Sequence, residues 1–387
     1  MKVLQINSVC GIRSTGRICT DLADVLLQDG HECMIAYGRE SVPEKYRKIA
    51  VRIGNDLDAK MHALQSRIFD NAGFGSKRAT EKFIDWVKKY DPDIIHLHNI
   101  HGYYINVEIL FNYLAEFNKP VVWTLHDCWA FTGHCAYYSY VKCDKWKTGC
   151  FNCTQKKRYP SSLLWDASKQ NWQKKKALFT SVKNMTLVTP SKWLANEVKK
   201  SFLSNYPMKV IANGIDLDVF KPTPSDFKEK NGFVGKKIIL GVASSWSECK
   251  GLKDFIELSK ILDEKYKIVL VGLSGNQIKE LPENVMAISR TNNVKELAEI
   301  YTAADIFFNP TYEDNFPTVN LEAQACGTPV ITYRTGGSVE SVPEENVVEQ
   351  GDFTKLTYRL EKTLEIAKNA AFNKNLLMKK YLEVYGL

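Results

Sequence analysis

The sequence predicts an α/β protein of two domains, each built on a parallel sheet with helices packed against it. Short apolar runs that end in turn residues alternate along the chain with amphipathic stretches of helical period. The chain has 387 residues, which favours two domains of about 150 to 200 residues over a single core. A polar segment with two prolines, from Pro222 to Lys230, separates two such alternating series and is typical of a linker.

The composition is that of a globular protein with an uneven charge distribution. Apolar residues make up 44% of the chain, and the net charge is +8. Residues 1–221 carry the positive excess, whereas residues 222–387 are slightly acidic. A basic first domain suits an anionic membrane surface, a phosphate-bearing acceptor or nucleic acid, although a solvated surface explains it equally well. We expect no nucleic-acid partner, because the sequence has no helix-turn-helix, aromatic RNA-binding motif or series of zinc fingers.

The start of the chain predicts a strand and not a targeting segment. Lys2 to Asn7 has a strand pattern, and no apolar run reaches the roughly 18 residues of a membrane span. We therefore expect a cytoplasmic protein, with peripheral binding to the inner face of the cytoplasmic membrane as an extension of that expectation. In this compartment the ten cysteines are expected to be thiols or metal ligands.

The first strand leads through a glycine-containing loop into an amphipathic helix that ends at Gly30. We expect Gly11, Ser14, Thr15 and Gly16 to form this loop. Backbone amides at such a position can approach a phosphate, and glycine allows the closest approach. The spacing differs from the GxGxxG of dinucleotide folds, so a plain tight turn is an equal alternative.

Histidines gather at the ends of two later strands. The run DIIHLH supplies His96 and His98, with His101 soon after, and VVWTLHD ends in His126 and Asp127. The carboxyl ends of parallel strands share one edge of a sheet, where ligands bind. Imidazoles there suit proton transfer or hydrogen bonding to a sugar, while a structural role remains the alternative for each single histidine.

A cysteine-rich insertion, residues 128–153, follows the second of these strands. It also holds several aromatic side chains, which suit either an acceptor surface or a small local core. Only its last two cysteines have the short spacing of a zinc knuckle. A structural zinc and a set of reduced thiols are equally consistent with the spacing of Cys135, Cys143, Cys150 and Cys153.

The second series begins with a strand, a polar loop and a helix that starts near Gly251. This arrangement places Lys250 beside helix amides, where an ammonium group can hold a diphosphate that gains charge as a bond breaks. An exposed lysine without a ligand is the ordinary alternative.

The stretch from Thr311 to Gly327 is the strongest candidate for a binding site. An apolar strand ends there, and a short helix starts near Pro317. Glu313, Asp314 and Asn315 lie beside the free amides of that helix, and Glu322 lies within it, roughly 7 Å further along its axis. The carboxylates of Asp314 and Glu322 would then contact one bound polyol phosphate from two sides. The alternative is an ordinary capped helix.

The segment LEAQACGTPV from Leu321 to Val330, with Asp314 seven residues before Leu321, resembles the donor-site motif of retaining glycosyltransferases of family 4. A second segment, Asn213 to Asp216, resembles the end of that family's first domain. The resemblance implies the GT-B fold, in which two Rossmann-like domains face each other across a cleft. The expected domains are residues 1–218 with the helix 373–387, and residues 219–372.

The resemblance also implies roles for individual residues. Glu322 would hold the nucleotide ribose, Asp314 with Asn315 the donor sugar, and His126 the sugar from the opposite domain. Lys250 and the backbone around Phe316, Pro317 and Thr318 would hold the diphosphate. Gly16 would let the first loop close over phosphate, and Ser244 stands where family members often have an arginine.

The function implied is transfer of a sugar, with retention, from a nucleotide-diphosphate sugar to a glycan or polyprenyl-linked acceptor of a surface polysaccharide pathway. No catalytic cofactor is expected, because orientation and charge stabilisation carry such a reaction. Three alternatives stay open: another GT-B enzyme such as a sugar-nucleotide epimerase or a phosphorylase, a degenerate transferase without activity, and a non-catalytic nucleic-acid or partner-binding module.

Overall fold

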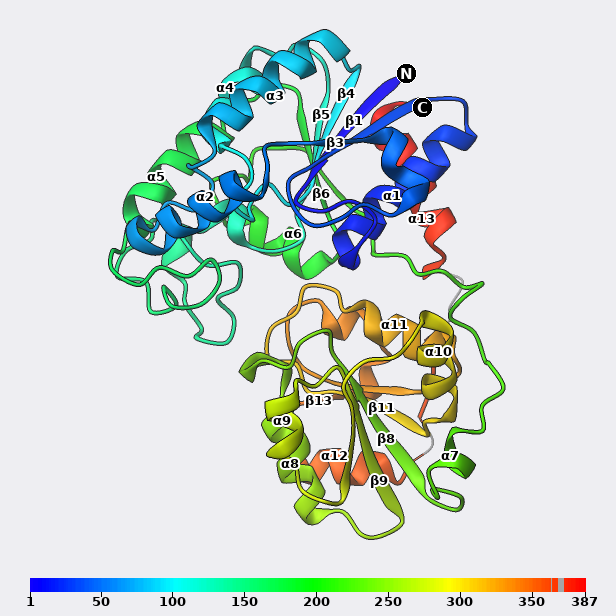
Figure 1. Ribbon diagram of the computed structural model, residues 1–387. Helices are drawn as coiled ribbons and strands as arrows, with labels where there is room; N and C mark the ends of the chain where they lie inside the picture. The colour runs from blue at the N-terminus through cyan, green and yellow to red at the C-terminus, as the bar shows by residue number, and fades with distance from the viewer. Residues whose placement is uncertain (363, 368–371) are drawn as a thin grey trace. The chain divides into compact units, whose positions relative to one another are not determined.

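The computed structural model of the protein describes residues 1–362, 364–367 and 372–387. The chain divides into two compact units (Figure 1). Unit 1 comprises residues 1–212 and 375–387, and unit 2 comprises residues 213–374. Each unit is a parallel sheet with helices, which confirms the predicted fold class.

The described residues of unit 1 form a seven-stranded parallel sheet in the order β3-β2-β1-β4-β5-β6-β7. The order reverses at β1, so the carboxyl ends of β1 and β4 lie at the switch point where such sheets bind ligands. In register, Gln5 of β1 is paired with His96 of β4. The strands are β1 Lys2–Asn7, β2 Glu32–Tyr37, β3 Ala50–Arg52, β4 Ile94–Leu97, β5 Val121–Thr124, β6 Met185–Thr189 and β7 Met208–Val210.

The helices of unit 1 connect these strands, and the last one comes from the end of the chain. They are α1 Arg13–Gln28, α2 Asp56–Phe69, α3 Lys77–Tyr90, α4 Val107–Glu116, α5 Ser168–Phe179, α6 Lys192–Lys199 and α13 Lys374–Tyr385, with 3-10 turns at Glu44–Ile49, Trp129–Phe131 and Lys145–Lys147. The apolar side of α13 packs into the same core as β1 and α1, through residues such as Tyr381 and Tyr385.

Two details of unit 1 differ from the pattern in the sequence. Residues 56–89 have a helical pattern in the sequence, but they form two helices, because Asp70 and Gly73 take positive φ angles of 54° and 91° that end the first helix. The first helix of the unit begins at Arg13, so Ser14, Thr15 and Gly16 belong to its first turn and not to the predicted loop. The prediction of that loop's extent was therefore wrong.

The cysteine-rich insertion packs its large aromatic rings into the main core of unit 1. Trp129, Phe131 and Trp146 are almost completely buried there. These three rings are therefore core residues, as in the packing alternative that the sequence left open, although they belong to the main core and not to a separate small one.

The described residues of unit 2 form a six-stranded parallel sheet in the order β10-β9-β8-β11-β12-β13. The switch point lies between β8 and β11. The strands are β8 Lys237–Val242, β9 Tyr266–Val271, β10 Val285–Ile288, β11 Ile306–Asn309, β12 Val330–Tyr333 and β13 Val347–Val348.

The helices of unit 2 alternate with its strands. They are α7 Phe227–Lys230, α8 Leu252–Ile261, α9 Gly275–Lys279, α10 Val294–Ala303, α11 Thr318–Ala325 and α12 Phe353–Leu360, with 3-10 turns at Glu248–Lys250, Ser338–Ser341 and Glu344–Asn346. Across the described ranges of the whole chain, no helix is both long and apolar enough to span a bilayer.

Candidate active site

The candidate site in unit 2 lies at the carboxyl ends of β8 and β11, at the switch point of the sheet. The loop after β8 ends in the 3-10 turn that carries Lys250, and the loop after β11 leads into α11. Pro317 is the N-cap of α11, and its ring has no atom that accepts a hydrogen bond from the first turn. The backbone at the start of α11 is therefore suited to an anion.

Lys250 and Asp314 form an ion pair between these two loops. The Lys250 Nζ lies 2.6 Å from Asp314 Oδ2, and the two side chains are 35% and 15% exposed. Gly251, with φ of 74°, follows the lysine, and a Cβ at this position would lie 2.3 Å from the Pro310 carbonyl oxygen. The close packing of the two loops thus brings the predicted cation and the predicted acid together.

The neighbours of Asp314 have other surroundings. Glu313 is buried, and its Oε2 accepts a hydrogen bond from the Cys249 thiol at 3.3 Å. Asn315 and Phe316 are also buried, and the Phe316 carbonyl accepts from Asn213 Nδ2 at 3.2 Å. Of the two adjacent carboxylates, it is Asp314 that reaches the lysine, while Glu313 helps to hold the loop.

Glu322 lies on α11, half-buried, and receives a hydrogen bond from α10. The Tyr301 hydroxyl donates to Glu322 Oε2 at 3.1 Å. Burial and the nearby Glu322 carboxylate raise the pKa of Tyr301 well above its usual range, so this hydroxyl remains a donor. The glutamate therefore has a polar environment and a fixed orientation. The sequence did not single out Tyr301, which lies 21 residues before Glu322.

A buried network of polar side chains connects α11 to β11 and to the 3-10 turn at Ser338–Ser341. Asn309 Nδ2 donates to Asn320 Oδ1 at 2.8 Å, and Asn320 Nδ2 donates to the hydroxyls of Ser338 and Ser341 at 3.2 and 2.9 Å. These bonds join the end of β11, the helix and the 3-10 turn that begins at Ser338. They fix the position of the helix that carries Glu322.

Three other predicted site residues lie in separate places. Thr318 is the first residue of α11, and Ser244 is exposed on the loop after β8. Gly16 is in α1 of unit 1, where its carbonyl accepts a hydrogen bond from the Gly11 amide at 3.0 Å. A Cβ at Gly16 would lie 3.1 Å from both Gly11 N and Val9 Cγ2, so the glycine allows the first loop to pack on the helix.

In unit 1, His126 belongs to a chain of hydrogen bonds at the ends of β1, β4 and β5. His126 Nε2 lies 3.1 Å from His98 Nδ1, and His98 Nε2 lies 3.1 Å from Gln5 Oε1. Burial lowers the pKa of His126 to about 4 and the pKa of His98 well below its usual range. Both rings are therefore neutral at pH 7.

A second polar group follows β5. His101 Nε2 lies 2.8 Å from Asp127 Oδ2, and its Nδ1 lies 2.9 Å from the Tyr159 hydroxyl. The other carboxylate oxygen of Asp127 accepts from the Trp129 amide at 2.9 Å. His101, Asp127 and Trp129 line a small cavity together with His98 and His126.

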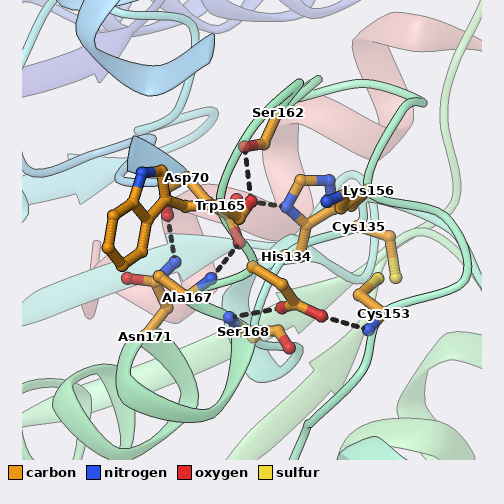
Figure 2. Close-up of polar contacts among 12 residues, drawn as sticks. Asp70, His134, Cys135, Cys153, Lys156, Ser162, Trp165, Ala167, Ser168 and Asn171 are labelled. Atoms are coloured by element: carbon orange, nitrogen blue, oxygen red, sulfur yellow. Dashed lines mark hydrogen bonds and ion pairs between the residues drawn. The ribbon is translucent and has the colours of Figure 1, made fainter. Parts of the chain in front are cut away.

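The four cysteines proposed as zinc ligands are only partly brought together. The thiols of Cys135 and Cys153 lie side by side within hydrogen-bonding range (Figure 2), whereas Cys150 Sγ accepts from the Gly133 amide at 3.2 Å. Cys143 is half-buried in the same insertion. Among the residues that the structure describes, no group of three or more His, Cys, Asp or Glu side chains is placed to hold a metal ion. The predicted zinc site thus finds no support here.

Comparison with known families identifies the chain. The family described as "Glycosyltransferase Family 4" matches residues 15–219, and "Glycosyl transferases group 1" matches residues 225–376. The chain belongs to glycosyltransferase family 4. The enzyme is accordingly a retaining glycosyltransferase of the hexosyltransferase type that uses a nucleotide-sugar donor, as the sequence predicted.

Relatives of this glycosyltransferase include two bacterial enzymes of glycan synthesis. WcaC of Escherichia coli K12, named as a colanic acid biosynthesis glycosyl transferase, is 24% identical over 376 residues, or 92% of this chain and 90% of WcaC. The N,N'-diacetylbacillosaminyl-diphospho-undecaprenol α-1,3-N-acetylgalactosaminyltransferase of Campylobacter jejuni is 30% identical over 49% of this chain and 58% of its own.

Solved structures share the GT-B fold of the enzyme. Sucrose-phosphate synthase from Thermosynechococcus elongatus superposes with a TM-score of 0.72 at 16% identity, over 100% of this chain and 98% of that one. Anabaena Alr3699/HepE in complex with UDP-glucose gives a TM-score of 0.65 at 16% identity, over 100% and 99% of the two chains. At these identities the likeness establishes the fold alone.

Proposed function

We propose that this glycosyltransferase moves a hexose from a nucleoside-diphosphate sugar to a lipid-linked acceptor during synthesis of a surface polysaccharide. The names of its relatives support the acceptor and the pathway, since one is named for colanic acid and the other acts on a diphospho-undecaprenol substrate. Its GT-B neighbour with bound UDP-glucose supports a UDP-sugar as the first donor to test.

The observation that carries the proposal for unit 2 is the Lys250–Asp314 ion pair at the switch point of the sheet. Without donor, Asp314 balances the charge of the ammonium group and holds it beside the start of α11. A diphosphate then offers Lys250 a second anionic partner, and the lysine stabilises the charge that develops on the leaving diphosphate. Asp314, with Asn315 behind it, faces the hydroxyls of the sugar.

The proposed place of the nucleoside follows from the direction of α11. Its amide end near Phe316, Pro317 and Thr318 accommodates the phosphates, and Glu322 lies more than one turn further on. A carboxylate held by the Tyr301 hydroxyl can accept hydrogen bonds from the two ribose hydroxyls. His126 of unit 1 contributes a hydrogen bond to the donor sugar, and no metal or organic cofactor takes part in the chemistry.

A donor screen tests this function. We would measure thermal stabilisation and release of nucleoside diphosphate with a panel of UDP-, GDP-, ADP- and TDP-sugars, in the presence of a polyprenyl-diphosphate-linked acceptor. We expect one donor to stabilise the protein and to yield a glycosylated lipid whose anomeric configuration is that of the donor. Absence of binding across the panel, or an inverted product, would contradict the proposal.

A further inference from the structure

Helix α2 of unit 1 turns most of its large apolar side chains to solvent. Leu57, Met61 and Leu64 follow one another at helical spacing, and each is more than half exposed. The residues that the helix buries are polar, namely His62 and Ser66. In a water-soluble protein the apolar stripe of a helix normally faces the core, so α2 has the opposite arrangement.

A neighbouring loop extends this apolar surface. The amides of Leu163 and Trp165 donate to the carbonyls of Arg67 and Ile68 at the end of α2, at 2.7 and 3.2 Å. These bonds attach the loop to the helix. The apolar face, as we define it, consists of seven side chains that are each more than half exposed: Leu57, Met61, Leu64, Phe69, Leu163, Leu164 and Trp165.

Cationic side chains accompany the apolar face. Lys60 and Arg67 lie on α2 itself, and Lys77 and Arg78 open the following helix α3; all four are exposed. Asp56 of the same helix is paired with Arg52, and Asp58 accepts a hydrogen bond from the Asn55 amide. An amphipathic helix that presents leucine, tryptophan and basic residues together binds at the interface of an anionic bilayer.

We propose that the apolar face docks unit 1 on an anionic lipid bilayer, with Trp165 and the leucines in the interfacial region and the basic residues against lipid phosphates. The inference gives a location to the lipid-linked acceptor of the proposed function. Docking would keep the enzyme in the plane in which such an acceptor diffuses.

Vesicle sedimentation tests the docking surface without donor or acceptor, so it is independent of the proposed transfer reaction. The protein should bind vesicles of phosphatidylethanolamine with phosphatidylglycerol and bind phosphatidylcholine vesicles much less. The triple variant Leu57→Ser, Leu164→Ser, Trp165→Ser should lose at least tenfold in vesicle affinity. A matched control, Val234→Ser, Ile261→Ser, Tyr358→Ser, removes three apolar side chains of unit 2 that are also more than half exposed and should bind like the wild type.

Two outcomes would overturn the docking proposal. One is a triple variant that binds anionic vesicles as well as the control variant does. The other is a wild type that forms a dimer which the triple variant abolishes, because a second copy would then be the occupant of the apolar face. Light scattering after size-exclusion chromatography separates these cases.

A second, independent inference concerns the chain of hydrogen bonds that ends at His126. Gln5 is completely buried, and its Nε2 donates to the Cys19 carbonyl at 2.9 Å, which leaves Oε1 directed at His98. An amide oxygen only accepts hydrogen bonds, so His98 must carry its proton on Nε2.

The direction of the next bond follows from the first. A neutral His98 with a proton on Nε2 has only a lone pair on Nδ1, so His126 must donate from its own Nε2. The two rings lie at 15° to each other, with their centres 5.4 Å apart. His126 then has its proton on Nε2 and its lone pair on Nδ1.

We propose that Gln5 and His98 are positioning residues that hold His126 as the neutral Nε2–H tautomer. This inference rests on the proposed sugar contact of His126 for its effect on turnover, but the tautomer itself can be measured without any substrate. A histidine fixed in this form has no second ring proton, so it does not act as an acid toward the sugar.

Nitrogen NMR of ¹⁵N-histidine-labelled protein tests the tautomer directly. The ring signals of His126, assigned by their loss in His126→Asn, should show a proton on Nε2 in the wild type at pH 7.5. A wild-type His126 that carries its proton on Nδ1, or on both nitrogens, would overturn the proposal whatever the activity of the enzyme.

Variants of the chain give the kinetic test. His98→Leu should mix the tautomers of His126 and lower kcat at least tenfold, with little change in the KM of the donor. His96→Leu is the matched control, because His96 is equally buried and lies 4.0 Å from His98 between ring centres, yet it bonds to Thr124 and Tyr385. It should keep the Nε2–H tautomer. Gln5→Leu, which removes the acceptor for His98, should lower kcat in the same way. Wild-type kcat in His98→Leu would refute the positioning role.

Discussion

The two units present polar groups at the same place in their sheets, but the groups differ in kind. Unit 1 gathers neutral, buried histidines whose pKa values are lowered, and all seven histidines of the chain belong to it. Unit 2 has none, and its switch point carries full charges in Lys250, Asp314 and Glu322. The charged unit is suited to a diphosphate, whereas the neutral unit is suited to hydroxyl groups, whose recognition depends on hydrogen-bond direction.

The largest expected effect of a single substitution is that of Lys250→Ala. Loss of the ammonium group removes the cation that we propose stabilises the leaving diphosphate, so we expect kcat to fall about a hundredfold. Steady-state kinetics with the donor found in the screen would measure it. Lys253→Ala is the matched control, because Lys253 is a more exposed lysine on the adjacent helix α8. This substitution should leave kcat unchanged. Equal kcat values for both variants would show that charge in unit 2 does not drive the reaction.

Acid should destabilise unit 1 more than unit 2. Burial lowers the pKa of His62 to about 4, and its Nε2 accepts from the amides of Gly73 and Gly75 at 3.2 and 3.1 Å, which protonation would prevent. The pKa of His62 is lowered in the folded state only. The contribution of the neutral His62 ring to the free energy of unfolding is therefore complete above pH 6.5 and is lost as the pH falls toward 4. For His62 alone the loss at pH 5 is about 2 kcal/mol of unfolding free energy.

Hydrogen exchange with mass spectrometry at pH 7 and pH 5, corrected for intrinsic rates, resolves this effect by unit. The opening free energy of the unit 1 sheet should fall while that of the unit 2 sheet stays nearly constant. A drop of the same size in both units would mean that the buried histidines do not determine the acid response.

Glu322→Ala should act on donor binding. The substitution removes the proposed acceptor for the ribose hydroxyls, so the KM of the donor should rise at least tenfold, which corresponds to about 1.4 kcal/mol. The control Glu257→Ala removes an exposed carboxylate of α8 and should leave KM unchanged. If kcat fell and KM did not change, the carboxylate would belong to the reacting sugar and not to the nucleoside.

Tyr301→Phe should give the smallest effect. It removes only the hydroxyl that orients Glu322, which is worth about 1 kcal/mol, or roughly a fivefold rise in donor KM. The double variant Tyr301→Phe, Glu322→Ala should be no worse than Glu322→Ala alone, because the two residues act through one contact. If the increases in donor KM of the two single variants were additive in the double variant, Tyr301 and Glu322 would act through different contacts.

Local patterns were enough to predict the fold and the family, while the roles of the individual site residues stay predictions. The strand that ends at Asn309, the proline before α11 and the spacing from Asp314 to Glu322 are all visible in one short stretch, and the family assignment that they suggested is confirmed. Contacts between distant residues were not predictable. The ion pair of Lys250 with Asp314 spans 64 positions, and nothing in the sequence near Gln5 indicates a bond to His98, 93 positions away.

Sequence patterns also failed where two packing solutions compete. Gly16 follows a strand and resembles part of a phosphate loop, but the chain enters α1 at Arg13 and uses the glycine to pack the loop. The helical pattern of residues 56–89 shows neither that the first helix, α2, ends at Phe69 nor which side of α2 is buried. In α2 the polar side is buried, because His62 packs against Gly73 and Gly75 and accepts hydrogen bonds from their backbone amides. A leucine at this position could not accept these bonds.

The central claim is that the charged edge of unit 2 binds the diphosphate of the donor. Calorimetric titration of the matching nucleoside diphosphate into the whole protein, without acceptor, tests it most directly. We predict that Lys250→Ala and Glu322→Ala each weaken the Kd at least tenfold, while Lys253→Ala binds like the wild type. Wild-type affinity in both site variants would contradict the account.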